Sequence, residues 1–146
     1  MRKALLPKLF LLSSLLCMTA NATVINGTNY LLYLGTATKC PDGSAILKSG
    51  NQRWCPGFTI KMSWTMPVLR ADGTPLPASE LAGYQVYWVR ATDMSSGTIN
   101  VQLATNTTAV MNTYNSGTYY MAVSAIGTNG SKSQLSKMVS ISLSKG

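Results

Sequence analysis

Three segments of this chain alternate large apolar residues with small or polar ones, and this alternation restricts the fold more than any other feature. They are residues 58–64 (FTIKMSW), 83–88 (GYQVYW) and 117–125 (GTYYMAVSA). A two-residue period places successive side chains on opposite faces of a β-strand. The sequence therefore predicts an all-β domain whose strands each bury one face.

The same alternation predicts which side chains form the core. We expect further strands at 30–34, 98–104, 108–111 and 135–143, with Leu103 facing inward. A register error of one residue would exchange the inward and outward sets. The predicted core contains Trp64, Tyr84, Val86, Tyr119, Met121 and Val123.

The charged residues argue against catalysis. Charged side chains make up only 11% of the chain, there is no histidine, and the acids are four in number. The chain therefore lacks the usual general base at neutral pH and any His/Cys cluster spaced for a metal ion. We expect no enzyme, no cofactor and no metal site.

The formal charge of +8 includes three basic residues at the extreme N-terminus, Arg2, Lys3 and Lys8. Without them nine basic residues stand against four acidic ones, and the nine form no run. Nucleic-acid binding normally needs a clustered basic stripe. We therefore expect no nucleic-acid partner.

Residues 1–22 have the pattern of a secretory signal peptide. A basic start precedes an apolar stretch centred on residues 9–16, and Ala20-Asn-Ala22 supplies a small-x-small ending. The apolar run has about ten residues, whereas a bilayer-spanning helix needs about 20. We expect cleavage after Ala22, export to the periplasm, cell surface or medium, and no stable membrane insertion afterwards.

Cys40 and Cys55 are the two cysteines that follow this signal. Outside the cytoplasm such a pair indicates a disulfide, which for a loop of this length would stabilise the fold by about 3 kcal/mol. The cysteines lie in residues 23–56, where 30–34 (YLLYL) predicts a strand bounded by Asn26-Gly27 and Gly35. This region is either the first strand of the domain with a disulfide loop or an N-terminal extension packed on its edge.

Residues 57–146 resemble a fibronectin type III domain of the kind found in exported bacterial and phage proteins. The matching motifs are Lys61-Met-Ser-Trp64 with Pro67, residues 72–76 (DGTPL) with 81–87 (LAGYQVY), 117–125, and the terminal strand from Ser136. The resemblance implies an immunoglobulin-like β-sandwich of about seven strands with Trp64 in its core. It also implies that Tyr119 is a tyrosine-corner residue whose hydroxyl bonds back to the backbone near Tyr114.

Three aromatic residues are candidate binding residues. If Val86 and Met121 face inward, Tyr87 and Tyr120 face outward on neighbouring strands. The tyrosines could stack on a sugar ring or anchor a protein, or they could form a cross-strand pair that only stabilises the sheet. Trp54 either lies exposed as a ligand platform or caps the disulfide at Cys55.

These features favour an exported, non-catalytic interaction or adhesion module that binds a protein or surface partner. One alternative is a carbohydrate-binding accessory module. Another is a structural subunit of an envelope or virion assembly, in which residues 30–34 add as an edge strand to a neighbouring subunit. The identity of the partner and the oligomeric state stay open.

Overall fold

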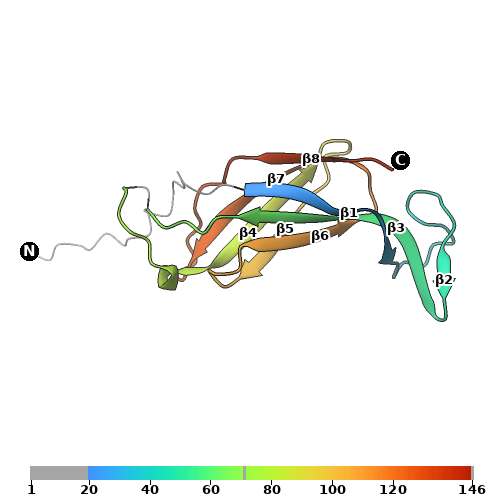
Figure 1. Ribbon diagram of the computed structural model, residues 1–146, viewed down its shortest axis with the longest axis horizontal. Helices are drawn as coiled ribbons and strands as arrows, with labels where there is room; N and C mark the ends of the chain where they lie inside the picture. Colours follow the sequence, from blue (N-terminus) through green and yellow to red (C-terminus); the bar gives the residue numbers. More distant parts are fainter. Residues whose placement is uncertain (1–19, 71, 146) are drawn as a thin grey trace, which may run out of the picture.

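The computed structural model describes residues 20–70 and 72–145, and within them it shows two antiparallel sheets packed face to face (Figure 1). One sheet has the order β1-β3-β2, with β6 also paired to β3, and the other has the order β5-β4-β7-β8. The predicted all-β sandwich is therefore confirmed. The strands are β1 (Ala20–Leu32), β2 (Leu47–Ser49), β3 (Gln52–Trp64), β4 (Leu81–Arg90), β5 (Ser96–Gln102), β6 (Thr108–Thr113), β7 (Gly117–Gly127) and β8 (Val139–Leu143), and a 3₁₀ turn (η2) covers Ala78–Glu80.

The first sheet is organised around β3. One edge of β3 pairs with β1, from Trp64 opposite Ala20 to Trp54 opposite Leu32, which are the two ends of β1. The other edge pairs with β6 and then with β2. The boundary predicted at residue 57 falls inside β3, so residues on both sides of it belong to one strand.

The strand predicted at 30–34 is longer than expected and begins earlier. Asn26-Gly27 does not end it, because the chain accommodates these residues as two register shifts, between Val24 and Asn26 and between Asn26 and Asn29. Of the predicted signal peptide, residues 1–19 lie outside the described residues, and residues 20–22 are the first three of β1.

The space between the sheets is filled by the predicted core. Trp64 is 5% exposed, and the other five predicted core residues are each 2% exposed or less. The indole of Trp64 packs against the ring of Tyr84 at a centroid distance of 5.1 Å. Among the described helical elements, none is long and apolar enough to cross a membrane.

Leu103 differs from its predicted inward position. The strand β5 ends at Gln102, and Leu103 has a left-handed backbone with φ of 74° and a side chain that is 68% exposed. This turn places the backbone carbonyl of Ala104 where the buried hydroxyl of Tyr84 donates to it at 2.7 Å. The turn interrupts the alternation and gives the buried phenol of Tyr84 its hydrogen-bond acceptor.

Tyr119 occupies the corner expected of it. Its hydroxyl donates to the carbonyl of Asn115 at 3.2 Å and lies 2.8 Å from the hydroxyl of Thr113. The neighbouring Tyr114 has another role, since its hydroxyl donates to the carbonyl of Leu32 at 2.7 Å and thereby ties the end of β6 to β1.

Four turns repeat one three-residue motif, Asx-x-Ser/Thr. In each, the first side-chain oxygen accepts hydrogen bonds from the backbone N–H and the hydroxyl of the third residue. Such turns satisfy backbone donors locally and so close connections without help from the core. The motif occurs at residues 42–44, 72–74, 93–95 and 129–131.

Candidate binding surfaces

The first candidate surface is a pocket of about 270 Å³ on the outer face of the second sheet. Tyr87 and Tyr120 both line it, together with Thr98, Ala122, Leu135 and Met138. Tyr87 lies opposite Ala122 and Tyr120 lies opposite Val89, so the two tyrosines are diagonal neighbours and not a directly opposed pair. The small side chain of Ala122 leaves open space between them.

Tyr120 is 38% exposed and Tyr87 is half-buried. The hydroxyl of Tyr87 donates to Oε1 of Gln85 at 2.5 Å, and Nζ of Lys132 donates to the same oxygen at 2.7 Å. Nε2 of Gln85 donates to Oδ1 of Asn100 at 2.8 Å. The hydroxyl of Tyr87 therefore lies among polar groups, and the ammonium of Lys132 is 3.4 Å from it.

One rim of the pocket comes from an irregular segment, residues 131–138, which follows the edge of β7 and supplies Leu135 and Met138. Ser133 and Ser136 are buried, and their hydroxyl oxygens accept hydrogen bonds from the backbone N–H groups of Ala125 (2.9 Å) and Val123 (3.0 Å). Their own N–H groups donate to the carbonyls of the same two residues. These serines thus serve as both donor and acceptor for β7.

The hydroxyl groups of two serines take the place of backbone acceptors in a regular strand ladder, so the backbone of the segment bulges. The strand β8 therefore begins at Val139 and not at the predicted residue 135. Leu135 and Met138 are carried to the outside, where they are 52% and 59% exposed. Sequence reasoning missed both residues. The signal that could have found them is the loss of alternation over residues 133–138 (SQLSKM).

The second candidate surface lies on an arm, residues 30–56, that projects beyond the end of the sandwich (Figure 1). The arm consists of the end of β1, the disulfide loop (residues 33–46), β2 and the first part of β3. Trp54 in β3 lies between Leu32 of β1 and Leu47 of β2, each directly opposite it in the ladder. Tyr30 and Pro56 form the next rung on the same side.

We call these five residues the arm face. Leu32 is 40% exposed, Leu47 48% and Tyr30 53%, while Trp54 and Pro56 are half-buried. Strand alternation places Trp54 and Pro56 on the side of β3 that carries the core residue Phe58. The arm face is therefore an apolar continuation of the sandwich interior past the end of the second sheet.

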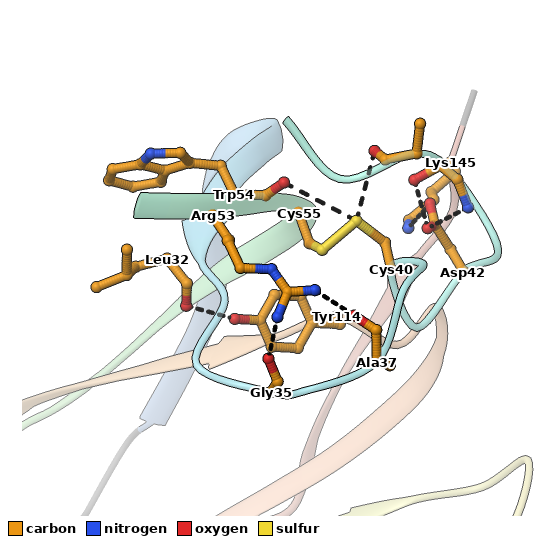
Figure 2. Close-up of a disulfide and its surroundings, with 12 residues drawn as sticks. Leu32, Gly35, Ala37, Cys40, Asp42, Arg53, Trp54, Cys55, Tyr114 and Lys145 are labelled. Carbon is orange, nitrogen blue, oxygen red and sulfur yellow. Dashed lines mark hydrogen bonds and ion pairs between the residues drawn. A yellow bond between two sulfur atoms is a disulfide. The ribbon is translucent and has the colours of Figure 1, made fainter. Parts of the chain in front are cut away.

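The opposite side of the arm is covered by the disulfide loop (Figure 2). Cys40 and Cys55 form a disulfide with Cα atoms 5.5 Å apart, and both residues are buried. The guanidinium of Arg53 donates to the carbonyl of Gly35 at 2.5 Å and to that of Ala37, and it lies 5.2 Å from the ring centroid of Tyr33. Trp54 follows Arg53 and points to the other side, so its indole does not cap the disulfide.

All four acids are held by ion pairs or turn hydrogen bonds, and none of them lines the pocket or belongs to the arm face. The ammonium of Lys145 and the hydrogen bonds from Ser44 hold the pKa of Asp42 well below its ordinary value. Arg90 and Ser95 do the same for the pKa of Asp93, and hydrogen bonds from Thr74 lower the pKa of Asp72. Glu80 pairs with Arg70 at 2.5 Å. Within residues 20–70 and 72–145, no group of three or more His, Cys, Asp or Glu could hold a metal ion.

The sequence reasoning thus identified three residues that the structure places on these two surfaces, with Tyr87 and Tyr120 in one pocket and Trp54 on the arm. It did not identify Leu32, Leu47, Leu135 or Met138 as their neighbours, because those contacts depend on strand register. Comparison of the chain with protein-family models and with curated proteins finds no match. The function of the two surfaces is therefore inferred from the chemistry of the residues that form them.

Proposed function

We propose that this protein is an exported, non-catalytic interaction module that binds a protein or surface partner through the outer-face pocket. The observation that carries this proposal is the pocket itself, where two tyrosines and two exposed aliphatic side chains surround an open space. Tyrosine supplies a rigid apolar face with a polar tip and is enriched where proteins bind partners. A concave apolar site with few polar groups is the usual form of a binding site.

We further propose that the sandwich is of the fibronectin type III kind. Three features support this: the packing of a β1-β3-β6 sheet on a β5-β4-β7-β8 sheet, the buried Trp64 and the corner hydrogen bond of Tyr119. Export is supported by the signal pattern of residues 1–22 and by the Cys40–Cys55 disulfide, because disulfides persist in oxidising compartments.

The proposal of a non-catalytic role rests on the bonds that hold the four acidic side chains and on the absence of histidine from the sequence. Each acid is held by an ion pair or by a turn hydrogen bond, and the chain has no histidine. A carboxylate that accepts such bonds is stabilised in its charged form and is a poor general base near neutral pH.

A carbohydrate-binding role is the second candidate, and the polar groups around the hydroxyl of Tyr87 favour it. The amide of Gln85 and the ammonium of Lys132 lie beside the hydroxyl of Tyr87, and Asn100 accepts a hydrogen bond from the amide of Gln85. Sugar recognition combines an aromatic face with such hydrogen-bonding groups. An assembly that donates residues 30–34 as an edge strand is less favoured, since Tyr30 to Leu32 already pair with β3 in the same chain.

The test is co-sedimentation of the processed, oxidised protein with cell envelopes, chitin, cellulose and peptidoglycan. The Tyr87→Ala/Tyr120→Ala variant removes the two rings, and Val110→Ala, an exposed position on β6, is the matched control. We expect envelope binding that the double variant loses and the control retains.

Retention on one purified polysaccharide, lost in the double variant, would instead favour the carbohydrate-binding role. Equal binding by the double variant and the wild type would overturn the assignment to this pocket. Absence of binding to every material would contradict both roles for these partners. Near-ultraviolet circular dichroism shows whether each variant keeps its packed core.

A further inference from the structure

The disulfide-loop side of the arm carries an open recess of about 830 Å³ that the proposed function does not use. Three of its lining residues are basic, Lys39, Lys48 and Arg53, and none is acidic. Lys39 and Lys48 are exposed, and Arg53 is half-buried. Within the part of the chain that the structure describes, no acidic side chain forms an ion pair with any of the three. The recess therefore presents positive charge that these residues leave uncompensated.

The strand pairing places two of these cations next to each other. Lys48 lies directly opposite Arg53 in the β2–β3 ladder, and directly opposed side chains share one face of a sheet. Like charges in such a pair destabilise the sheet. Arg53 has a structural task, because its guanidinium donates to the carbonyls of Gly35 and Ala37.

Lys48 has no such task, since its ammonium makes no hydrogen bond or ion pair with another described residue. A lysine can protect a sheet edge from aggregation, but β2 has only three residues, and Lys39 lies outside the named strands. Folding alone therefore does not explain why the two lysines are placed beside Arg53. A ligand of opposite charge would explain it.

The disulfide fixes the third cation relative to the other two (Figure 2). Lys39 directly precedes Cys40, and Cys40 is bonded to Cys55, two residues after Arg53 in β3. The backbone of Lys39 is also held by a β-bridge to Ala45. The backbone positions that carry the three charges are thus set before a ligand arrives, and such preorganisation lowers the cost of binding.

The uncharged lining residues indicate the chemistry of the ligand. Thr36 and Thr38 are exposed, and their hydroxyls have no hydrogen-bond partner among the described residues. The other lining residues are small or aliphatic, and none is aromatic: Ala37, Gly43, Ala45 and Ile46. Recognition at this recess therefore depends on positive charge and hydroxyl groups and not on stacking.

This composition separates the possible anionic ligands. Single-stranded nucleic acid is held by aromatic rings that stack on its bases, and duplex DNA is held by many phosphate contacts, whereas the recess has no aromatic lining and three cations. A protein partner is normally anchored by large side chains buried in a well-packed centre, which an open recess does not provide. An acidic polysaccharide carries separated anionic groups with hydroxyls between them. These groups match the lysines and the threonine hydroxyls.

We propose that the recess on the disulfide-loop side binds the anionic groups of an acidic polysaccharide. Lys39 and Lys48 contact its sulfate or carboxylate groups, and Thr36 and Thr38 form hydrogen bonds with its hydroxyls. Arg53 adds its charge from the wall of the recess while its N–H groups stay on the loop carbonyls. The site is separate from the outer-face pocket, and it does not require the arm face.

The experiment is a fluorescence-anisotropy titration of labelled polymers with the processed, oxidised protein, its N-terminus established by mass spectrometry. The probes are dextran sulfate, alginate and uncharged dextran. We expect binding to both acidic polymers, at least about tenfold weaker binding to dextran, and weaker binding to the acidic polymers when salt is raised.

Two matched variants distinguish this site from the general positive charge of the protein. Lys39→Gln/Lys48→Gln removes two charges from the recess, and Lys61→Gln/Lys137→Gln removes two exposed charges elsewhere. We expect the recess variant to weaken binding by about tenfold or more and the control to weaken it by less than about threefold. Tyr87→Ala/Tyr120→Ala should bind the acidic polymers as the wild type does, so failure of this proposal is distinguishable from failure of the pocket proposal.

Amide NMR spectra of the wild type give a second readout that needs no substitution. Adding a short dextran sulfate fragment should shift the signals of residues 36–48 and of Arg53, while those of Tyr87 and Tyr120 should stay unchanged. Near-ultraviolet circular dichroism shows whether each variant keeps its packed core.

Four results would overturn the proposal. The first is failure of the wild type to bind either acidic polymer, and the second is equal weakening by the two glutamine variants. The third is equal binding to uncharged dextran, which would show that the contact does not depend on the anionic groups. The fourth is loss of binding only in Tyr87→Ala/Tyr120→Ala, which would move the contact to the pocket. Tighter binding to duplex DNA than to either polymer at the same salt, lost in Lys39→Gln/Lys48→Gln, would instead assign the recess to nucleic acid.

Discussion

At the scale of single residues, the four Asx-x-Ser/Thr turns show how far a three-residue motif can set local backbone geometry. The middle residue takes a left-handed conformation, with φ of 84°, 81° and 83° at Gly43, Gly73 and Gly130. In the fourth turn the middle residue is Met94, with φ of 58°. Only glycine adopts this conformation without a steric cost from its side chain.

Met94→Gly should therefore stabilise the protein. The left-handed conformation costs a residue with a Cβ about 1–2 kcal/mol, and glycine returns part of this as greater entropy of the unfolded chain, so the expected gain is about 0.5–1 kcal/mol. Met94 is 72% exposed, so little packing is lost. The free energy of unfolding in urea measures the effect. Gly73→Ala, the converse change in a matching turn, should be destabilising, and an unchanged or lower stability of Met94→Gly would contradict the explanation.

The core residues could be predicted from sequence because their burial follows from a two-residue period alone. Trp64, Tyr84 and Val123 need no knowledge of their partners to be assigned to the inside. Leu103 could not be assigned correctly, because its exposure depends on a turn that serves the hydroxyl of Tyr84. Strand alternation assigns each residue to one face of a sheet. It carries no information about a hydrogen bond between Tyr84 and the residue Ala104, twenty positions later.

At the scale of elements, the segment 131–138 lies along β7 with side-chain oxygens in place of a regular ladder. Buried N–H groups must be satisfied, and here Ser133 and Ser136 satisfy those of Ala125 and Val123. The irregular backbone is thus a built feature that displays Leu135 and Met138 at the pocket.

Ser136→Ala should destabilise the protein by about 1–3 kcal/mol, because it leaves the buried N–H of Val123 without its acceptor. Ser140→Ala in β8 is the matched control, since Ser140 is exposed, and its effect should stay within about 0.5 kcal/mol. Chemical denaturation of both variants provides the comparison. Equal effects of the two substitutions would show that the hydroxyl of Ser136 is not needed by β7.

The lengths of β1 and β3 could not be predicted from the sequence, because they depend on how the two strands pair. Asn26-Gly27 is a turn signal by itself, and only the continuous edge of β3 keeps the chain extended through it. The arm face has the same origin, since Leu32 and Leu47 are far apart in sequence and meet only through their common partner Trp54.

At the scale of the whole molecule, the disulfide joins the arm to itself across a sequence separation of 15 residues. We expect Cys40→Ala/Cys55→Ala to lower the free energy of unfolding by about 3 kcal/mol, because the unfolded chain regains the entropy of an open loop. Urea denaturation of the oxidised wild type and the variant measures this difference. A difference near zero would show that other arm contacts, such as those of Arg53, hold the loop without the bond.

Stability should be flat between about pH 5 and 8 and fall in acid. The chain has no histidine to titrate in the neutral range. The folded-state pKa values of Asp42, Asp72 and Asp93 lie below the ordinary value of 3.8, so their stabilising contribution is complete above pH 3.8 and is lost as the pH falls below it. Urea midpoints across this range test the expectation. Asp42→Asn/Asp93→Asn should weaken the acid dependence, and an unchanged dependence would locate it elsewhere.

The pairing of the outermost strands also sets how the molecule responds to tension. Thr23, opposite Lys61, lies toward the end of β3 far from the arm, whereas Lys145 lies beside the arm through its contact with Asp42 (Figure 1). A force that pulls these two ends apart acts along β1 and β8, perpendicular to the hydrogen bonds that hold them to β3 and β7. Those bonds are then loaded together in shear and cannot be opened one at a time, so a molecule anchored at both ends would resist extension with its whole ladder.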